Sequence, residues 1–199
     1  MAGLTDVLAG PVLEVAPRLL GATLTHAGVS LRLTEVEAYA GPDDPGSHAY
    51  RSRTARNAVM FGPAGRLYTY FSYGMHVCAN VVCGPDGTAA AVLLRAGEVV
   101  AGLETAHARR PTAKGRDTDL ARGPARLCQA MGIGLEHGGA DLGAGPVSLE
   151  LGDPVGSVST GPRVGLRGAA QRPWRFWITG DPSVSTYRPA APRTPRRGA

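Results

Sequence analysis

The sequence Leu31-Arg32-Leu33-Thr34-Glu35-Val36-Glu37-Ala38-Tyr39 mixes apolar and polar side chains at a period of two. This period is typical of a β-strand, and it places Glu35, Glu37 and Tyr39 on one face. Two carboxylates on one face of a strand are unusual. We therefore take residues 31–39 as the strand around which a site is built, and consider what the flanking sequence adds to it.

The segment that follows supplies aromatic rings and positive charge. A turn leads to His48 and then to an acid-free stretch, 51–66, that holds four arginines. An apolar strand at 67–71, a turn at Ser72-Tyr73-Gly74 and a second strand at 75–82 form a predicted hairpin. Carboxylates, a histidine, tyrosines and arginines are what a pocket for a flat, electron-poor ring beside an anionic backbone needs.

Length and composition favour one soluble domain. The chain has 199 residues, enough for a single hydrophobic core. Its 28 glycines and 16 prolines predict short elements joined by many turns. We find neither the roughly 18-residue apolar run of a membrane span nor a secretion signal, so we expect a cytoplasmic protein without a membrane partner. The three cysteines lack metal-binding spacing, and no structural metal is expected.

The net charge of +5 is weak evidence by itself, because much of it lies in an arginine-rich C-terminal end. Local clusters are more informative. Besides the arginines of 51–66, the chain carries Arg109-Arg110 and the pair Arg122 and Arg126. Such clusters favour a polyanionic partner, of which nucleic acid is the usual example.

Local patterns predict the remaining elements. Pro124 and Gly132 bracket one helix, and the spacing of Val99, Leu103 and Ala106 predicts another. The predicted helices are 12–20, 98–110 and 124–131. The further predicted strands are 22–26, 89–94 ending in Arg95, 147–151, 163–166 and 175–178. From Pro182 the composition indicates a disordered tail, and we divide the chain into a domain at 1–185 and a tail at 186–199.

Glu37 has two interpretations. As a salt-bridge partner of Arg95, whose strand should lie beside the one carrying Asn80, it would only stabilise the sheet. As a general base, a partly buried carboxylate next to an arginine can orient and deprotonate a water molecule. Glu35 is better explained as structural.

Tyr39, His48 and Tyr70 are expected near Glu37. Singly, each could be a core aromatic residue. Together, their faces suit a base pulled out of a nucleic-acid helix, above all a cationic base. Tyr73 lies at the tip of a tight hairpin, where burial is hard to arrange, and it is a candidate wedge that fills the gap left in the base stack.

A set of short motifs is spread over most of the chain. They are Glu37-Ala38-Tyr39, Ser47-His48, Arg56-Asn57 with Met60-Phe61, the run from Leu67 to Met75, Asn80, Leu93-Leu94-Arg95-Ala96, Gly102-Leu103-Glu104, Gly123-Pro124 with Leu127-Cys128-Gln129-Ala130, and Arg163-Val164-Gly165. Between about Leu19 and about Ser185 the chain resembles the alkyladenine (3-methyladenine) DNA glycosylase family, also called the methylpurine DNA glycosylase family. The resemblance implies a single compact α/β (mixed α+β) domain with a curved antiparallel sheet, a protruding β-hairpin and flanking helices.

The resemblance also implies a role for each site residue. Glu37 would activate the attacking water, which the side chain of Arg95 and the backbone carbonyl of Val164 would also hold. Asn80 would discourage the exocyclic amine of normal guanine. The flipped base would lie among Tyr39, His48 and Tyr70. The duplex would be contacted by Tyr73, Arg56, Arg126 and Met75.

The chemistry fits such an enzyme. Alkylation at purine N3 or N7 puts positive charge on the ring and weakens the glycosidic bond, so the enzyme has chiefly to position water and stabilise charge developing on the sugar. Strand nicking would need an amine for a Schiff base, and the only side-chain amine is that of Lys114, in a polar loop. We predict a monofunctional base-excision repair glycosylase that acts as a monomer, without metal or organic cofactor. Its partner would be double-stranded DNA containing a damaged purine: 3-methyladenine, 7-methylguanine, hypoxanthine or ethenoadenine.

Two alternatives stay open. A non-enzymatic nucleic-acid binder would use the same basic clusters and Tyr73, with Glu37 only a salt-bridge partner. A metal-dependent hydrolase would use the acids and histidine clustered in this region, although two strand glutamates at this spacing are a poor ligand geometry. Its candidate ligands are Glu35, Glu37, Asp43, Asp44 and His48.

Overall fold

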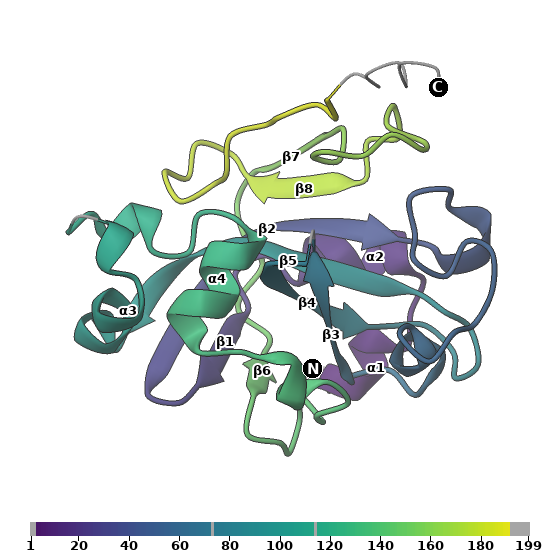
Figure 1. Cartoon of the computed structure of the whole chain (residues 1–199), viewed down its shortest axis with the longest axis horizontal. Helices are drawn as coiled ribbons and strands as arrows, with labels where there is room; N and C mark the ends of the chain where they lie inside the picture. The colour runs from purple at the N-terminus through teal and green to yellow at the C-terminus, as the bar shows by residue number, and fades with distance from the viewer. Residues whose placement is uncertain (1–2, 73, 114, 192–199) are drawn as a thin grey trace, which may run out of the picture.

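The predicted strand at 31–39 is the central strand of the observed sheet, β2 (Val29–Tyr39). In the computed structural model, which describes residues 3–72, 74–113 and 115–191, β2 pairs along one edge with β5 (Ala91–Ala101). Along its other edge it pairs first with β1 (Thr23–His26) and then with β8 (Arg175–Ile178). The sheet therefore divides at β2 into two arms (Figure 1).

The strands of the described residues form one eight-stranded antiparallel sheet in the order β3-β4-β5-β2-β1-β6, with β7 and β8 attached through β2. Register shifts on both sides of Glu35 mark irregularities in β2, and such bulges bend a strand and increase its twist. The predicted single mixed domain with a curved antiparallel sheet is confirmed. The other strands are β3 (Leu67–Ser72), β4 (His76–Val82), β6 (Ser148–Glu150) and β7 (Val158–Gly161).

Helices pack against this sheet, and in the described part of the chain none of them is long and apolar enough to cross a bilayer. α2 contacts β2, β5 and β8, whereas α4 contacts β4, β5 and β2. Pro124 begins α4 and Gly132, with φ 72°, follows its last residue, as predicted. The α-helices are α1 (Leu4–Leu8), α2 (Val12–Arg18), α3 (Leu103–Arg109) and α4 (Pro124–Met131). The 3-10 helices are η1 (Gly41–Asp43), η2 (Ala58–Phe61), η3 (Pro111–Ala113), η4 (Asp117–Asp119) and η5 (Leu135–His137).

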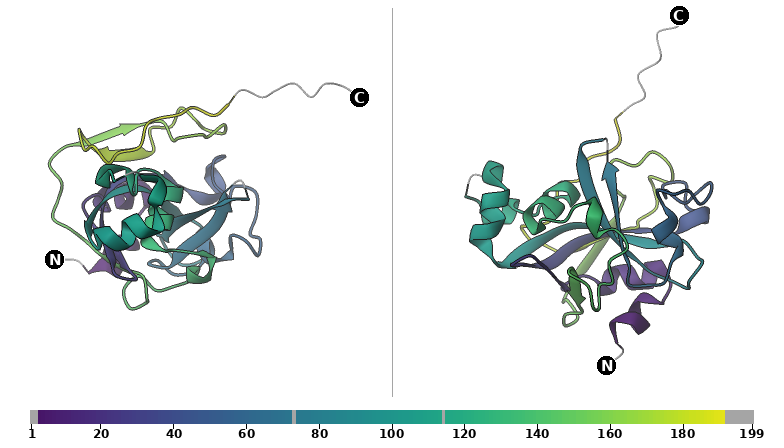
Figure 2. Two further views of the ribbon diagram at one scale, coloured as in Figure 1. Left: turned by 60° about the vertical axis from the view of Figure 1, so that its left-hand side comes forward. Right: turned by 60° about the horizontal axis from the view of Figure 1, so that its bottom comes forward.

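The predicted hairpin is formed by β3 and β4, which pair from Leu67 and Val81 out to Ser72 and His76. It projects from the body of the molecule between α3 and α4 on one side and the loop at 41–66 on the other (Figure 2). Side chains on its two sides therefore face different surroundings, and this arrangement creates the two cavities described below.

The prediction around Arg95 was wrong in its element boundaries. The strand does not end there but continues as β5 to Ala101, and the helix predicted at 98–110 shortens to α3. Gly97 allows the longer strand, because a Cβ at this position would lie 2.6 Å from the carbonyl oxygen of Arg32 on β2. Arg95 thus sits within a strand, where its side chain is held on one face of the sheet.

Two predictions near the C-terminus were also wrong. Residues 163–166 form a turn rather than a strand, and the strand in this region is β7. The disordered tail does not begin at Pro182, because Ser183 is 1% exposed and the backbone N–H of Ser185 donates to Glu35 over 2.6 Å, while residues 192–199 of the predicted tail lie outside the described residues. Further along, the carbonyl oxygen of Arg188 accepts a hydrogen bond from Gly165.

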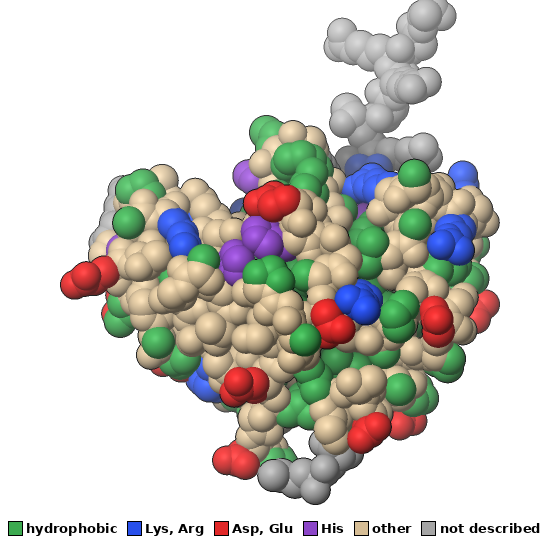
Figure 3. Space-filling view, turned by 90° about the horizontal axis from the view of Figure 1, so that it is seen from below, with side chains coloured by type: hydrophobic (Ala, Val, Ile, Leu, Met, Phe, Trp, Pro, Cys, Tyr) green, Lys and Arg blue, Asp and Glu red, His purple; other side chains and the backbone are tan. Residues whose placement is uncertain are grey.

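Positive and negative side chains are mixed on the face of the molecule that Figure 3 shows. Acidic side chains are scattered among isolated arginine side chains on this face (Figure 3). The net charge of +5 is therefore not a continuous basic coat here. Arginines do line the two cavities described below: Arg56 and Arg95 line one, and Arg110 and Arg126 line the other.

Candidate active site

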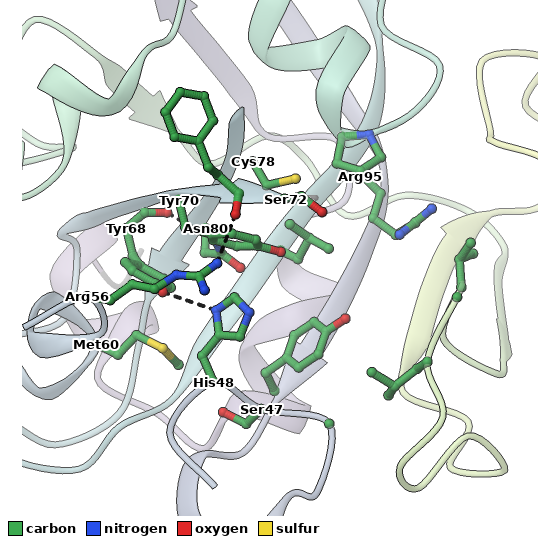
Figure 4. Close-up of a pocket in the computed structure, with 18 of the residues that line it drawn as sticks. Ser47, His48, Arg56, Met60, Tyr68, Tyr70, Ser72, Cys78, Asn80 and Arg95 are labelled. Carbon is green, nitrogen blue, oxygen red and sulfur yellow. Dashed lines mark hydrogen bonds between the residues drawn. The ribbon is translucent and has the colours of Figure 1, made fainter. Parts of the chain in front are cut away.

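A cavity of about 580 Å³ opens beside the β3–β4 hairpin (Figure 4). Most of its wall comes from the segment 46–48, the hairpin, β5 and the turn at 164–166, and individual residues of β2, the segment 56–60 and α4 complete it. The predicted residues Tyr39, His48, Arg56, Tyr70, Asn80, Arg95 and Val164 all line it. The fold thus brings together in one pocket residues that the sequence spreads over more than half of its length.

Glu37 lies behind the wall of this cavity, with a fully buried side chain. One carboxylate oxygen accepts the backbone N–H of Val164 at 2.7 Å, and the other accepts the hydroxyl of Tyr39 at 2.9 Å. A guanidinium nitrogen of Arg95 lies 3.3 Å from the second oxygen. The carbonyl of Val164 was predicted to hold the attacking water, and this stays a prediction because the observed contact is between Glu37 and the N–H. Three groups that line the cavity therefore surround the carboxylate.

Glu35 forms a second, tighter ion-pair centre. One of its oxygens accepts from Nε of Arg95 and Nε of Arg175, both at 2.7 Å. Ser185 donates to it through both backbone N–H and hydroxyl. Burial alone would raise the pKa of Glu35, but the two arginines and Ser185 outweigh it and hold the pKa below its ordinary value. Glu35 is thus a fixed anion that orients Arg95, in agreement with its predicted structural character.

The aromatic wall consists of His48, Tyr68 and Tyr70. The rings of His48 and Tyr70 meet edge to face with centroids 4.4 Å apart, and Tyr68 stacks on Tyr70 at 5.6 Å. Nδ1 of His48 and the hydroxyl of Tyr68 are hydrogen-bonded at 3.1 Å. Burial, and then the charge of Arg56, lower the pKa of His48 below its ordinary value. The ring is therefore neutral at physiological pH.

The hydroxyl groups of Tyr39 and Tyr70 stay protonated. Burial, and then the nearby Glu37, raise the pKa of Tyr39 well above its ordinary value. Burial also raises the pKa of Tyr70, with a further contribution from Cys78. Tyr39 can consequently act only as a donor to Glu37, and this hydrogen bond fixes the orientation of the carboxylate.

The remaining predicted residues occupy different places. Arg56 donates to the carbonyl oxygen of Phe71 at 2.8 Å and lies over the Tyr70 ring, so it forms part of the pocket wall. The amide of Asn80 donates to the carbonyl oxygen of Tyr68, deep in the pocket. Met75 is 72% exposed next to the hairpin tip. Arg126 lies on the other side of the hairpin, and Tyr73 lies outside the described residues.

Three of the four carboxylates proposed as metal ligands, those of Glu35, Glu37 and Asp44, are held by arginines. Asp44, fully buried, forms a paired contact with the guanidinium of Arg163, one nitrogen lying 2.7 Å from one of its oxygens. Glu35 and Glu37 are bound as described above. In the described part of the chain, no three histidine, cysteine or acidic side chains are grouped as metal ligands would be. Because these carboxylate lone pairs are already engaged, the arrangement does not favour the metal-dependent alternative.

Several site residues were missed by the sequence interpretation. Tyr68 could have been found, because it alternates with Tyr70 on the same strand face. Arg163, Arg175 and Ser185 could not, since their partners lie more than a hundred residues away in the sequence. No local pattern marks such pairs.

Comparison with known proteins gives the class first: this chain is a DNA glycosylase, an N-glycosyl hydrolase. The sequence model of the family described as Methylpurine-DNA glycosylase (MPG) matches residues 6–182. The chain belongs to this family, and the resemblance noted in the sequence is confirmed.

Bacterial relatives align over nearly all of the chain. A protein of Leifsonia xyli subsp. xyli is 57% identical over 194 residues, covering 92% of this chain and 91% of the relative. A protein of Nocardia farcinica is 57% identical over 189 residues, covering 90% and 88%. A protein of Mycobacterium tuberculosis is 54% identical over 201 residues, covering 98% of each. All three carry the name "Putative 3-methyladenine DNA glycosylase".

Proposed function

We propose that this protein removes alkylated purines, 3-methyladenine first among them, from double-stranded DNA by hydrolysing the N-glycosidic bond of a flipped nucleotide. The observation that carries the proposal is the position of Glu37. Its carboxylate is held by Tyr39, Arg95 and Val164, all of which line a cavity walled by aromatic rings. The names of the bacterial relatives support the choice of substrate.

In the proposed reaction, a water molecule enters between Arg95 and Val164 and gives a proton to Glu37. Its oxygen bonds to C1′ of the sugar, while the bond from C1′ to the purine nitrogen breaks and its electron pair leaves with the base. The negative charge of Glu37 also stabilises the positive charge that develops on the sugar. A cationic alkylated purine leaves as a neutral molecule, so no acid is needed for this step.

The aromatic wall supports recognition of a cationic base. The rings of Tyr39, His48 and Tyr70 line the cavity, and the π-electron density on the faces of such rings attracts a positively charged base. Asn80, which lines the cavity, would discourage the exocyclic amine of guanine. Tyr73, Met75, Arg56 and Arg126 remain the proposed DNA contacts.

The state of His48 bears on the range of lesions. Hypoxanthine and ethenoadenine are neutral and need a proton on the leaving group, and His48 is the nearest candidate acid. Since its pKa is lowered, the ring is mostly neutral near pH 7 and donates a proton poorly. We therefore rank 3-methyladenine and 7-methylguanine above the neutral lesions.

The enzyme would be monofunctional and leave an intact abasic site. Lys114, the only side-chain amine, lies outside the described residues, and the amine chemistry of a lyase is not part of the proposal. We propose that a monomer acts in the bacterial cytoplasm, where the DNA is, without metal or organic cofactor.

The test is base release from duplex oligonucleotides that each carry one modified purine, with a chelator present. The native protein should release the alkylated base and leave the strand unbroken until alkali is added. Glu37→Gln should reduce base release by at least about a thousand-fold, because it removes both the general base and the negative charge beside the sugar. The affinity for DNA should stay within a few-fold of the native value.

Other outcomes would contradict the proposal. If the native protein binds the duplex without releasing the base, the nucleic-acid binder is the better account, and Glu37 only stabilises the sheet. If chelation stops the reaction, the metal-dependent account replaces it. Strand cleavage without alkali would contradict the monofunctional assignment.

A further inference from the structure

A second cavity, of about 550 Å³, lies on the opposite side of the β3–β4 hairpin from the aromatic pocket. Met75, His76 and Val77 of the hairpin form one of its walls, and residues of α4 form another. The hairpin is thus flanked by two cavities, one aromatic and one basic, and the second cavity borders it near its tip.

Arg110 lines the second cavity, and its hydrogen bonding is incomplete. Its side chain is almost fully buried, with the residue 6% exposed, and Nε finds no partner among the described residues. Its two terminal nitrogens donate only to neutral oxygens, the side chain of Gln129 at 3.2 Å and the backbone of Asp119 at 3.3 Å. A buried guanidinium with an unpaired N–H is costly unless an anion completes it.

A second positive charge lines the same cavity. Arg126, exposed on the first turn of α4, also borders it. Burial, and then the charge of Arg126, lower the pKa of Arg110. The charge of Asp119 opposes this shift only in part. In the described part of the chain, no carboxylate lies within ion-pair distance of either arginine, so the cavity holds two like charges without an ion-pair partner.

We propose that this second cavity binds a backbone phosphate of the duplex, held by Arg110 and Arg126, while the damaged base occupies the aromatic pocket across the hairpin. This inference rests on the proposed function, because it is the flipped base that brings the DNA backbone to the hairpin. A phosphodiester offers oxygens that accept the N–H groups of a planar guanidinium. It also carries a negative charge, which would neutralise the two arginines. Because Arg110 is buried, exposure alone would not identify it as a DNA contact.

The test measures equilibrium binding to a duplex with one modified purine at several salt concentrations. Arg110→Gln and Arg126→Gln are each expected to weaken binding about ten-fold and to make the plot of log K against log salt shallower by roughly 0.9, the value of one phosphate contact. Arg110→Lys, which keeps the charge, should restore most of the slope. Arg18→Gln, an exposed arginine on α2, removes the same charge elsewhere and should leave the slope unchanged.

The other possible outcomes also support or overturn the proposed phosphate site. If Arg110→Gln unfolds, Arg126→Gln carries the test alone, because its side chain is exposed. Slopes equal to that of the native protein in folded variants would overturn the proposal. Thermal stabilisation by inorganic phosphate that depends on Arg110, with unchanged slopes for DNA, would assign the site to a free anion instead. Base release by the native protein on the same duplex reports separately on the proposed function.

Discussion

Glu35 and Glu37 lie two residues apart on β2, and both side chains are fully buried, yet their surroundings differ. Glu35 is enclosed by two arginines and Ser185, whereas Glu37 is bound by groups that line the aromatic cavity. The carboxylate of Glu35 therefore holds Arg95 in place, whereas that of Glu37 is the general base of the proposed reaction. At this scale the two roles follow from hydrogen-bond partners rather than from the residue type.

Replacing Glu35 by glutamine should be strongly destabilising. Arg95 and Arg175 would keep their charges in a buried site without the shared anion, and breaking such a pair costs about 3–5 kcal/mol. Urea unfolding followed by circular dichroism would measure this loss. As a matched control, Glu98→Gln removes an ion pair with Arg32 whose glutamate side chain is 53% exposed, and should cost less than about 1 kcal/mol.

The pH dependence of the free energy of unfolding tests the contribution of Glu35 independently. Because its pKa is lower in the folded protein, its stabilisation is present above the unfolded pKa of about 4.5 and is lost as pH falls below that value. The native protein should therefore lose more stability between pH 6 and pH 3 than Glu35→Gln does. Equal losses in the two proteins would show that the ion-pair centre contributes little.

At the scale of elements, the close pairing of β2 and β5 places Arg95. Gly97 lets the backbones approach, and a Cβ there would lie 2.2 Å from a methyl of Leu31 as well as 2.6 Å from the Arg32 carbonyl. The pairing continues on both sides of this contact, so the strand that carries Arg95 cannot shift without opening the sheet.

Gly97→Ala should therefore lower the free energy of unfolding by about 1–3 kcal/mol, the usual cost of overpacking. It should also reduce base release, because β5 would move Arg95 away from Glu37. Gly156→Ala is the control, since a Cβ at Gly156 meets nothing within 4 Å. A fully stable and active Gly97→Ala variant would mean that the sheet relaxes around the new methyl group at no cost.

At the scale of the whole molecule, the chain after β8 returns to the centre of the sheet. Ser185 donates to Glu35 and accepts from Arg175 through its carbonyl oxygen, while the carbonyl of Val184 accepts from Arg122. The match to the family model ends at residue 182, just before these contacts begin. The segment 183–185 nevertheless completes the ion-pair centre behind the cavity.

A chain that ends at Pro182 should accordingly be less stable by at least about 3 kcal/mol, because several buried polar groups lose their partners. A chain that ends at Ala191 keeps all of the contacts described and is the comparison. Thermal unfolding of the two, with base release measured below both midpoints, makes the test. Matching midpoints would show that water replaces Ser183 and Ser185 without loss.

Local sequence was sufficient wherever a repeat or a punctuating residue acts over a few positions. The alternation in β2, the Ala27–Gly28 turn with φ values of 44° and 81°, and the Pro124 and Gly132 limits of α4 were all predictable, because strand pleat and backbone stereochemistry act locally. The family motifs likewise identified the class of enzyme and the residues that share the aromatic pocket.

Tertiary structure alone decided which distant groups bind the two glutamates besides Arg95. Glu35 binds Ser185 at a sequence separation of 150 residues, and Glu37 binds the N–H of Val164 at a separation of 127. The continuation of β5 past Arg95 and the placing of Arg110 beside a second cavity were equally invisible in the sequence. These contacts depend on strand register and loop paths, which are fixed by packing over the whole molecule and leave no periodic trace in the chain.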